Sequence, residues 1–180
     1  MIPMKALTGF LFTCLFMATA QADGPIFHVF GDARLIASWN YDSGAADASG
    51  YLSNGDQLLL RSQQMSIGIS AVHKNIGKQL AYIDQESAAS AEIAVYEYDF
   101  DKDGDPEIMI VDSPEYSIVN IRIFRYSNGL AELVGHFSGQ FAIHLEGNSI
   151  SLPYGSQGLS SDYIYRGGAF FELVYHSPEE

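Results

Sequence analysis

Hydrophobic and polar residues alternate with a period of two over several parts of the chain. Val119, Ile121 and Ile123 are apolar, whereas the intervening Asn120 and Arg122 are polar. The same alternation recurs in residues 65–70, 141–146 and 149–152. Because successive side chains of a strand point to opposite faces of a sheet, this pattern predicts half-buried antiparallel strands.

Turn-forming residue pairs separate these apolar runs. Four pairs have the composition of tight hairpin turns: Asn54-Gly55, Asn128-Gly129, Gly147-Asn148 and Gly167-Gly168. Glycine and asparagine tolerate the positive φ angles that type I′ and II′ turns require. The spacing predicts an all-β fold of about ten to twelve short strands, arranged as a single antiparallel β domain of the sandwich or small propeller-like type.

Three segments depart from the alternating pattern. Alanine and glutamate cluster in residues 85–93, so a helix stays open as an alternative there. Residues 41–50 and 153–161 are rich in small and polar residues, which predicts two long loops. We find no linker and no repeat of fixed period, and therefore expect one domain over residues 23–180.

Residues 1–22 have the composition of a secretory signal peptide. Lys5 ends a short cationic start, residues 6–18 are apolar, and Ala20-Gln21-Ala22 is a small-x-small cleavage site. The apolar run is too short to remain in a bilayer as a spanning helix. We therefore expect a periplasmic or secreted protein that is not inserted in the membrane after cleavage.

Cys14 is the only cysteine and would leave with the signal peptide. Acylation of Cys14 is the alternative, but Thr13 stands where lipoproteins usually carry glycine or alanine, and apolar residues follow. A mature chain without a thiol has no disulfide, thiolate metal site or cysteine nucleophile. Its stability must then come from a hydrophobic core or from a bound ion.

The chain is acidic, with 22 Asp and Glu residues against nine Lys and Arg, and a formal net charge of −13. Removal of residues 1–22 makes this charge one unit more negative, because Lys5 is the only charged residue there. A surface of this sign repels nucleic acids and anionic lipids. It favours cations and basic protein partners.

Acidic residues occupy alternate positions of one short segment: Asp99, Asp101, Asp103, Asp105 and Glu107. Calcium takes roughly six to eight oxygen ligands, and a tight loop can supply them from alternate positions. Asp105 would contribute its backbone carbonyl, Glu107 would close the coordination sphere, and Gly104 permits the sharp bend. Without a cation these carboxylates repel one another. The segment therefore predicts a Ca²⁺ site.

Residues 98–111 resemble the FG-GAP/VCBS calcium-binding repeat of integrin-like propellers. An EF-hand would place its closing glutamate at the twelfth position, where Ile110 stands, and helices would flank its loop. Here the flanks are strand-like, over residues 93–98 and 108–111. The resemblance implies a calcium-binding β-hairpin loop, although the family loop ends in aspartate and the motif occurs once in this chain.

The single calcium loop, the signal peptide, the size and the acidity are also similar to those of two groups of exported proteins. These are the calcium-binding immunity proteins that neutralise secreted peptidoglycan hydrolases, and the periplasmic lysozyme inhibitors. The resemblance implies a protein that binds a basic peptidoglycan hydrolase. The glycine-rich segment 153–161 and the tyrosines near it offer candidate contacts: Tyr154, Ser156, Gln157 and Tyr163.

The sequence contains no recognisable catalytic constellation. Tyr154 stands where a nucleophile elbow has its first glycine, and the five histidines show no metal-ligand spacing. We therefore expect a binding protein and not an enzyme. Two alternatives stay open: a calcium-dependent carbohydrate or envelope-binding module, and a hydrolase that uses an unrecognised pair of carboxylates.

Overall fold

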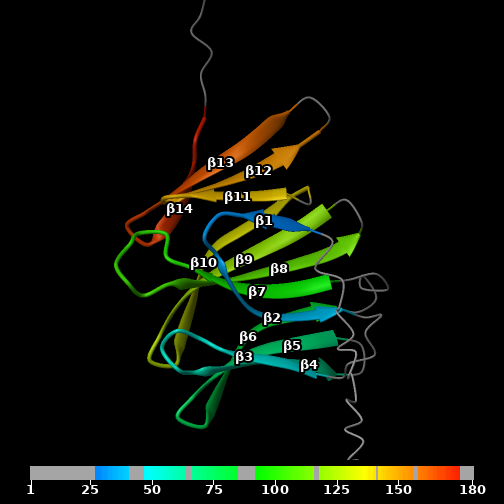
Figure 1. Cartoon of the computed structure of the whole chain (residues 1–180), viewed down its shortest axis with the longest axis vertical. Coiled ribbons are helices and arrows are strands. Elements are labelled where there is room, and N and C mark those ends of the chain that lie inside the picture. Colours follow the sequence, from blue (N-terminus) through cyan, green and yellow to red (C-terminus); the bar gives the residue numbers. More distant parts are fainter. Residues whose placement is uncertain are drawn as a thin grey trace, which may run out of the picture.

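The computed structural model describes residues 27–40, 47–63, 66–84, 92–115, 118–140, 142–155 and 158–174. Within these ranges all regular structure is β-strand, and the strands form three sheets that lie one on another (Figure 1). The prediction of an all-β fold is confirmed. In the same ranges no helix is present that could cross a membrane.

Each sheet is built on a run of consecutive strands, and two of the three sheets add one strand from near the start of the chain. One outer sheet contains β3 (Asp47–Tyr51), β4 (Gln57–Gln63), β5 (Ser66–His73) and β6 (Ile76–Asp84), in that order. The central sheet has the order β10-β9-β8-β7-β2, formed by β2 (Arg34–Asn40), β7 (Glu92–Tyr98), β8 (Glu107–Glu115), β9 (Ile118–Ser127) and β10 (Leu130–Gly139). The other outer sheet contains β1 (His28–Phe30), β11 (Ala142–Glu146), β12 (Ser149–Tyr154), β13 (Leu159–Arg166) and β14 (Ala169–Glu172).

Two details of the strand prediction are wrong. The described residues contain fourteen strands, more than the ten to twelve expected. β1 pairs with β11 in parallel, with His28 opposite Ala142, so the domain is not purely antiparallel. A parallel pair needs a long connection between its strands, and period-two alternation carries no information about strand direction.

The middle of the central sheet is buried on both faces. Every residue of β7 is buried, and alternate residues belong to different cores. Ile93 and Val95 pack toward the β3–β6 sheet, whereas Ala94 and Tyr96 pack toward the sheet of β11–β14. Two hydrophobic layers between three stacked sheets give a sandwich architecture, and β7, β8 and β9 lie at its middle.

The loop predictions need correction at both segments. Residues 47–50 belong to β3, so the expected loop at 41–50 contains a strand. β12 extends to Tyr154 and β13 begins at Leu159, so both ends of the expected loop at 153–161 belong to paired strands, and residues 156–157 are outside the described ranges. In the segment left open for a helix, Ile93 lies in β7, and residues 85–91 are outside the described ranges.

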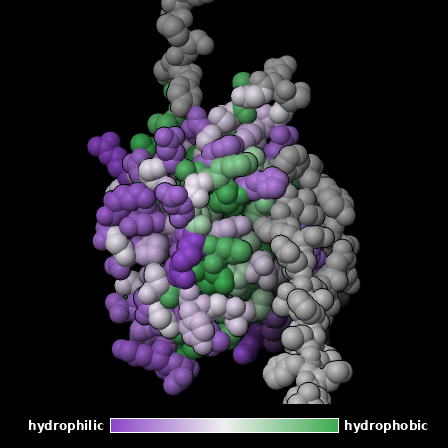
Figure 2. Space-filling model, in the orientation of Figure 1, coloured by the Kyte–Doolittle hydropathy of each residue, from purple (hydrophilic) through white to green (hydrophobic). Residues whose placement is uncertain are grey.

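The surface is not uniformly polar. Figure 2 shows hydrophobic side chains gathered over the middle of the stack on the viewed face, with hydrophilic side chains around them. The exposed apolar residues include Phe30 on β1 and Leu35 on β2, which are about half exposed. Phe30 stacks on His144, with the ring centroids 4.7 Å apart.

Candidate metal centre

The acidic segment lies in the hairpin that joins β7 to β8, two central strands of the middle sheet. Tyr98 pairs with Glu107, so the connecting residues form a loop at the end of this pair. Lys102 (φ 62°) and Gly104 (φ 94°) reverse the chain direction. The amide of Gly104 donates a hydrogen bond to Asp99 Oδ2 at 3.0 Å, which holds the reversal in place. The prediction of strand-like flanks is confirmed.

Three of the five predicted ligands come together. One ligand oxygen from each of Asp99, Asp101 and Glu107 lies within 4.8 Å of the other two. The remaining two side chains lie apart from this cluster. Asp103 Oδ1 accepts a hydrogen bond from the Asp105 amide at 2.8 Å, and Asp105 lines a neighbouring pocket. The cluster therefore extends from the interior to the surface: Glu107 is buried, Asp99 is half-buried and Asp101 is exposed.

The buried side of the cluster holds negative charge with little compensation. Burial raises the pKa of Glu107, and the charge of Asp101 acts in the same direction. The Phe100 amide, 3.2 Å from Glu107 Oε2, partly opposes this effect. Asp99 Oδ1 is buried and accepts no hydrogen bond from the part of the chain that the structure describes. A buried carboxylate oxygen without a donor is unfavourable unless a cation binds it.

An aromatic cluster anchors the loop to the second core. Phe100 is fully buried and makes edge contacts with Tyr98 at 4.7 Å and Phe170 at 5.0 Å between centroids. The Tyr165 hydroxyl is also buried and has no hydrogen bond of regular geometry in the described structure. Burial raises the pKa of Tyr165, and the negative charge of Glu107 raises it further. An apolar residue at the second loop position was the only sequence signal for this anchor.

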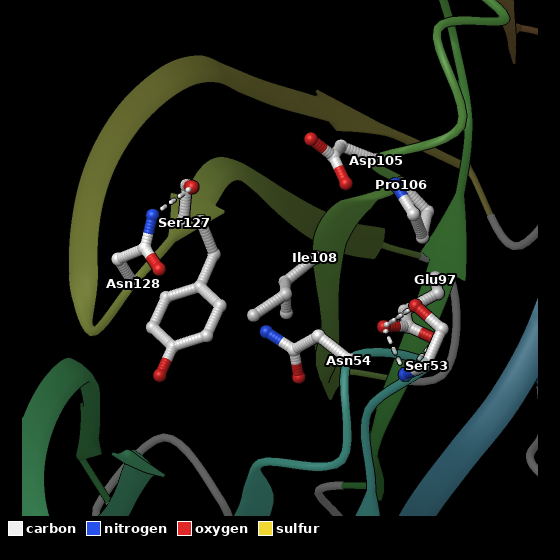
Figure 3. Close-up of a pocket in the computed structure, with 9 residues that line it drawn as sticks. Ser53, Asn54, Glu97, Asp105, Pro106, Ile108, Ser127 and Asn128 are labelled. Atoms are coloured by element: carbon white, nitrogen blue, oxygen red, sulfur yellow. Dashed lines mark hydrogen bonds between the residues drawn. The ribbon is translucent and has the colours of Figure 1, made fainter. Parts of the chain in front are cut away.

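A pocket of about 230 Å³ lies beside the loop (Figure 3). Its lining residues come from three turns and from the ends of strands: Ser53, Asn54, Glu97, Asp105, Pro106, Ile108, Tyr126, Ser127 and Asn128. Glu97 is buried, accepts hydrogen bonds from the amide of Ser53 at 2.9 Å and its hydroxyl at 3.1 Å, and forms an ion pair with Arg34. The sequence did not predict this pocket, because its walls are far apart along the chain.

The predicted partner-binding residues do not form one loop. Tyr154 ends β12 and is 46% exposed, so it remains available for a contact. Tyr163 lies within β13 and packs on Phe137 with a centroid distance of 4.4 Å, so it is a half-buried packing residue. Ser156 and Gln157 lie outside the described residues.

Comparison of the chain with protein-family models, with curated protein sequences and with solved structures finds no match in any of the three. The likeness of residues 98–111 to the FG-GAP/VCBS repeat therefore stays a prediction from the loop motif.

Proposed function

We propose that this protein is a calcium-stabilised binding domain that acts through contacts with another protein. The observation that carries the proposal is the convergence of Asp99, Asp101 and Glu107 within 4.8 Å in a hairpin of the central sheet. The ion would be structural, because the loop it closes connects the two strands on which both cores are built.

The donor chemistry of the cluster suits calcium. Carboxylate oxygens are hard ligands, and calcium accepts them in flexible geometry with backbone carbonyls and waters completing the sphere. Asp99 and Glu107 would hold the ion from the two ends of the loop, and Asp101 would close its exposed side. A divalent ion would also supply a partner for the buried Asp99 Oδ1. The Asp105 carbonyl is a further candidate ligand.

Isothermal titration calorimetry tests the metal assignment directly. We expect the purified protein to bind one calcium ion per chain, and Asp101→Asn to remove this binding. Lys102→Ala is the matched control in the same loop, because its side chain lies over the Tyr98 ring and not in the carboxylate cluster. Equal affinity in wild type and Asp101→Asn would show that the cluster is not the site.

The charge of the chain supports a basic protein as the partner. With 22 acidic against nine basic residues, the protein attracts a partner of opposite charge and accelerates the encounter at low ionic strength. We propose inhibition of, or immunity against, a basic cell-wall hydrolase in the periplasm or outside the cell as the specific form of this function. The likeness to calcium-binding immunity proteins that we predict from the single calcium loop, the size and the acidity points the same way.

Affinity capture from a cell-envelope extract tests the partner. The tagged protein is incubated with the extract in calcium and, in parallel, in chelator, and the recovered proteins are identified. Recovery of a basic cell-wall hydrolase that the protein also inhibits, with weaker recovery in chelator, would support the proposal. Recovery of no protein in either condition would contradict it.

A second candidate, a carbohydrate-binding module, is favoured by the outer face of the β3–β6 sheet. A shallow groove of about 410 Å³ runs over β4 and β5, lined by Leu59, Arg61 and Ser70 among others. Tyr51 and Tyr82, 65% and 60% exposed, lie on the same face at its two edges. Exposed aromatic rings beside polar groups suit stacking of sugar rings. Retention on immobilised peptidoglycan or polysaccharide, lost in Tyr51→Ala and Tyr82→Ala, would favour this function.

A further inference from the structure

We infer that the pocket beside the calcium loop receives a cationic side chain, arginine or lysine, from the protein partner. The inference rests on the proposed protein-binding function and names the chemistry by which the partner is recognised. Four independent features support it: the convergence of three turns, the state of the hydrogen-bond donors, the balance of charge, and the apolar wall.

Three turns that are distant in sequence build the pocket. Asn54 follows β3, Asp105 precedes β8, and Asn128 lies in the turn between β9 and β10. Figure 3 shows Asp105 and Asn128 on opposite sides of the space, with Ile108 between them. A volume of about 230 Å³ suits one side chain or a molecule of that size. The pocket is therefore a receptacle for a single protruding group.

Several donors of the lining are engaged within the protein. Asn54 Nδ2 donates to Asp56 Oδ2 at 3.3 Å, and Asn128 Nδ2 donates to the hydroxyl of Ser127 at 3.2 Å. The amide and hydroxyl of Ser53 both donate to Glu97. An anion needs several donors from its site. The engagement of these donors therefore disfavours an anion.

Acceptors remain on the two sides of the pocket. Neither the Asp105 carboxylate nor Asn128 Oδ1 accepts a hydrogen bond from another residue in the described ranges. The negative charge of Glu97 is balanced by Arg34, whereas Asp105 forms no ion pair with the described part of the chain. One unbalanced carboxylate facing one amide oxygen suits the several N–H donors of a guanidinium or an ammonium group.

The remaining wall suits the stem of such a side chain. Pro106 and Ile108 supply apolar surface, and the ring of Tyr126 lines the pocket beside them. Lysine and arginine bury their methylene groups along apolar surface while the charged end meets acceptors, and an aromatic ring attracts the cation further. Tyr126 is fixed in place because its hydroxyl donates to Asp56 Oδ2 at 2.8 Å.

Nuclear magnetic resonance titration of the isotopically labelled, calcium-loaded protein tests the pocket without the partner. The probes are N-acetyl-arginine amide and N-acetyl-lysine amide, with N-acetyl-glutamine amide as the uncharged control and N-acetylglucosamine as the sugar. We expect saturable, salt-sensitive shifts at residues 53–54, 105–108 and 126–128 with the two cationic probes. No saturable shift there, or an equal response to the glutamine probe or the sugar, would overturn the inference.

Asp105→Asn is the decisive variant, and Asp47→Asn is its matched control. Both aspartates are exposed, but Asp47 lies on β3 and does not line the pocket. We expect Asp105→Asn to weaken binding of the arginine probe about tenfold, and Asp47→Asn to leave binding of this probe unchanged. Equal weakening by the two variants would mean that net charge and not the pocket attracts the probe, which overturns the inference.

The partner experiment separates this inference from the proposed function. Capture of a hydrolase with unchanged affinity by Asp105→Asn would overturn the pocket assignment and leave the proposed function intact. Saturable binding of the arginine probe at the pocket, with no protein recovered from the extract, would overturn the proposed function and leave the pocket chemistry intact.

Discussion

Substitution of Asp101 by asparagine should have opposite effects on stability with and without calcium. In calcium, the variant loses a ligand and with it the stabilisation that the ion gives the native state. In chelator, it loses one of three carboxylates that lie within 4.8 Å of one another and repel. Asparagine keeps the size and the hydrogen-bonding capacity of the side chain, so charge and ligand strength are the main changes.

The magnitudes of the two effects differ. An ion that binds only the native state at a hundredfold excess over its Kd adds about 2.7 kcal/mol to the free energy of unfolding. For a domain of this size, that corresponds to a rise in Tm of roughly 5 to 11 °C. Two unit charges at the cluster spacing of 4.8 Å repel by about 3.5 kcal/mol at an effective dielectric constant near 20. Because Asp101 is exposed, solvent screens most of this, and relief of up to about 1 kcal/mol remains.

Differential scanning calorimetry in calcium and in chelator measures both effects on the same protein. We expect the wild type to melt higher than Asp101→Asn in calcium and slightly lower than Asp101→Asn in chelator. Lys102→Ala should shift Tm by the same small amount in both conditions, since it removes only the contact with Tyr98. A variant that is less stable than the wild type by the same margin in both conditions would refute the reasoning, because Asp101 would then act without an ion.

Three further predictions concern the scaffold. Burial, assisted by Glu92, raises the pKa of Tyr96 to about 12, so the stabilisation from this residue is present below pH 10 and is lost as the pH rises toward 12. Tyr96→Phe should therefore reduce the alkaline loss of unfolding free energy, measured by urea unfolding, by up to about 2 kcal/mol. An unchanged dependence of the unfolding free energy on pH would contradict this. Glu97→Ala should lower the free energy of unfolding by about 2 kcal/mol because Ser53 loses its acceptor, whereas no change in the urea midpoint would show that water replaces it. Ile110→Ala, at a fully buried central position, should cost about 2 to 5 kcal/mol, against less than about 0.5 for the exposed Leu130→Ala; comparable midpoints for the two would contradict the two-sided burial of the central sheet.

Local features of the fold could be predicted from the sequence because their causes are local. Asn128 and Gly129 adopt positive φ angles of 50° and 79°, as a type I′ hairpin turn requires. The β7–β8 hairpin could be predicted because strand-like flanks border one acidic loop. Lys74 and Asn75 form a turn of the same kind, with φ angles of 47° and 68°. The sequence did not predict this turn, because the pair contains no glycine.

Features that depend on distant contacts could not be predicted. β3 has the composition of a loop, yet Gly50 is required because a Cβ there would lie 2.1 Å from the Ile36 carbonyl oxygen. The small residues of β3 thus allow close approach to β2. The sequence predicted five ligands. It could not show that Asp103 accepts a hydrogen bond from the loop backbone or that Asp105 lines a pocket. These choices depend on neighbours that the loop itself does not contain.

The distribution of the first three strands has a consequence for how the protein folds. β1, β2 and β3 follow one another in the chain, but each joins a different sheet. The β3–β6 sheet can form as soon as residues 47–84 are available. In contrast, β2 can pair only after β7 is in place, and β1 only after β11 is in place. Because these pairings have a high contact order, folding should be slow and should finish with the docking of β1. A chain that ends before β11 would leave β1 without a partner and expose a strand edge to aggregation.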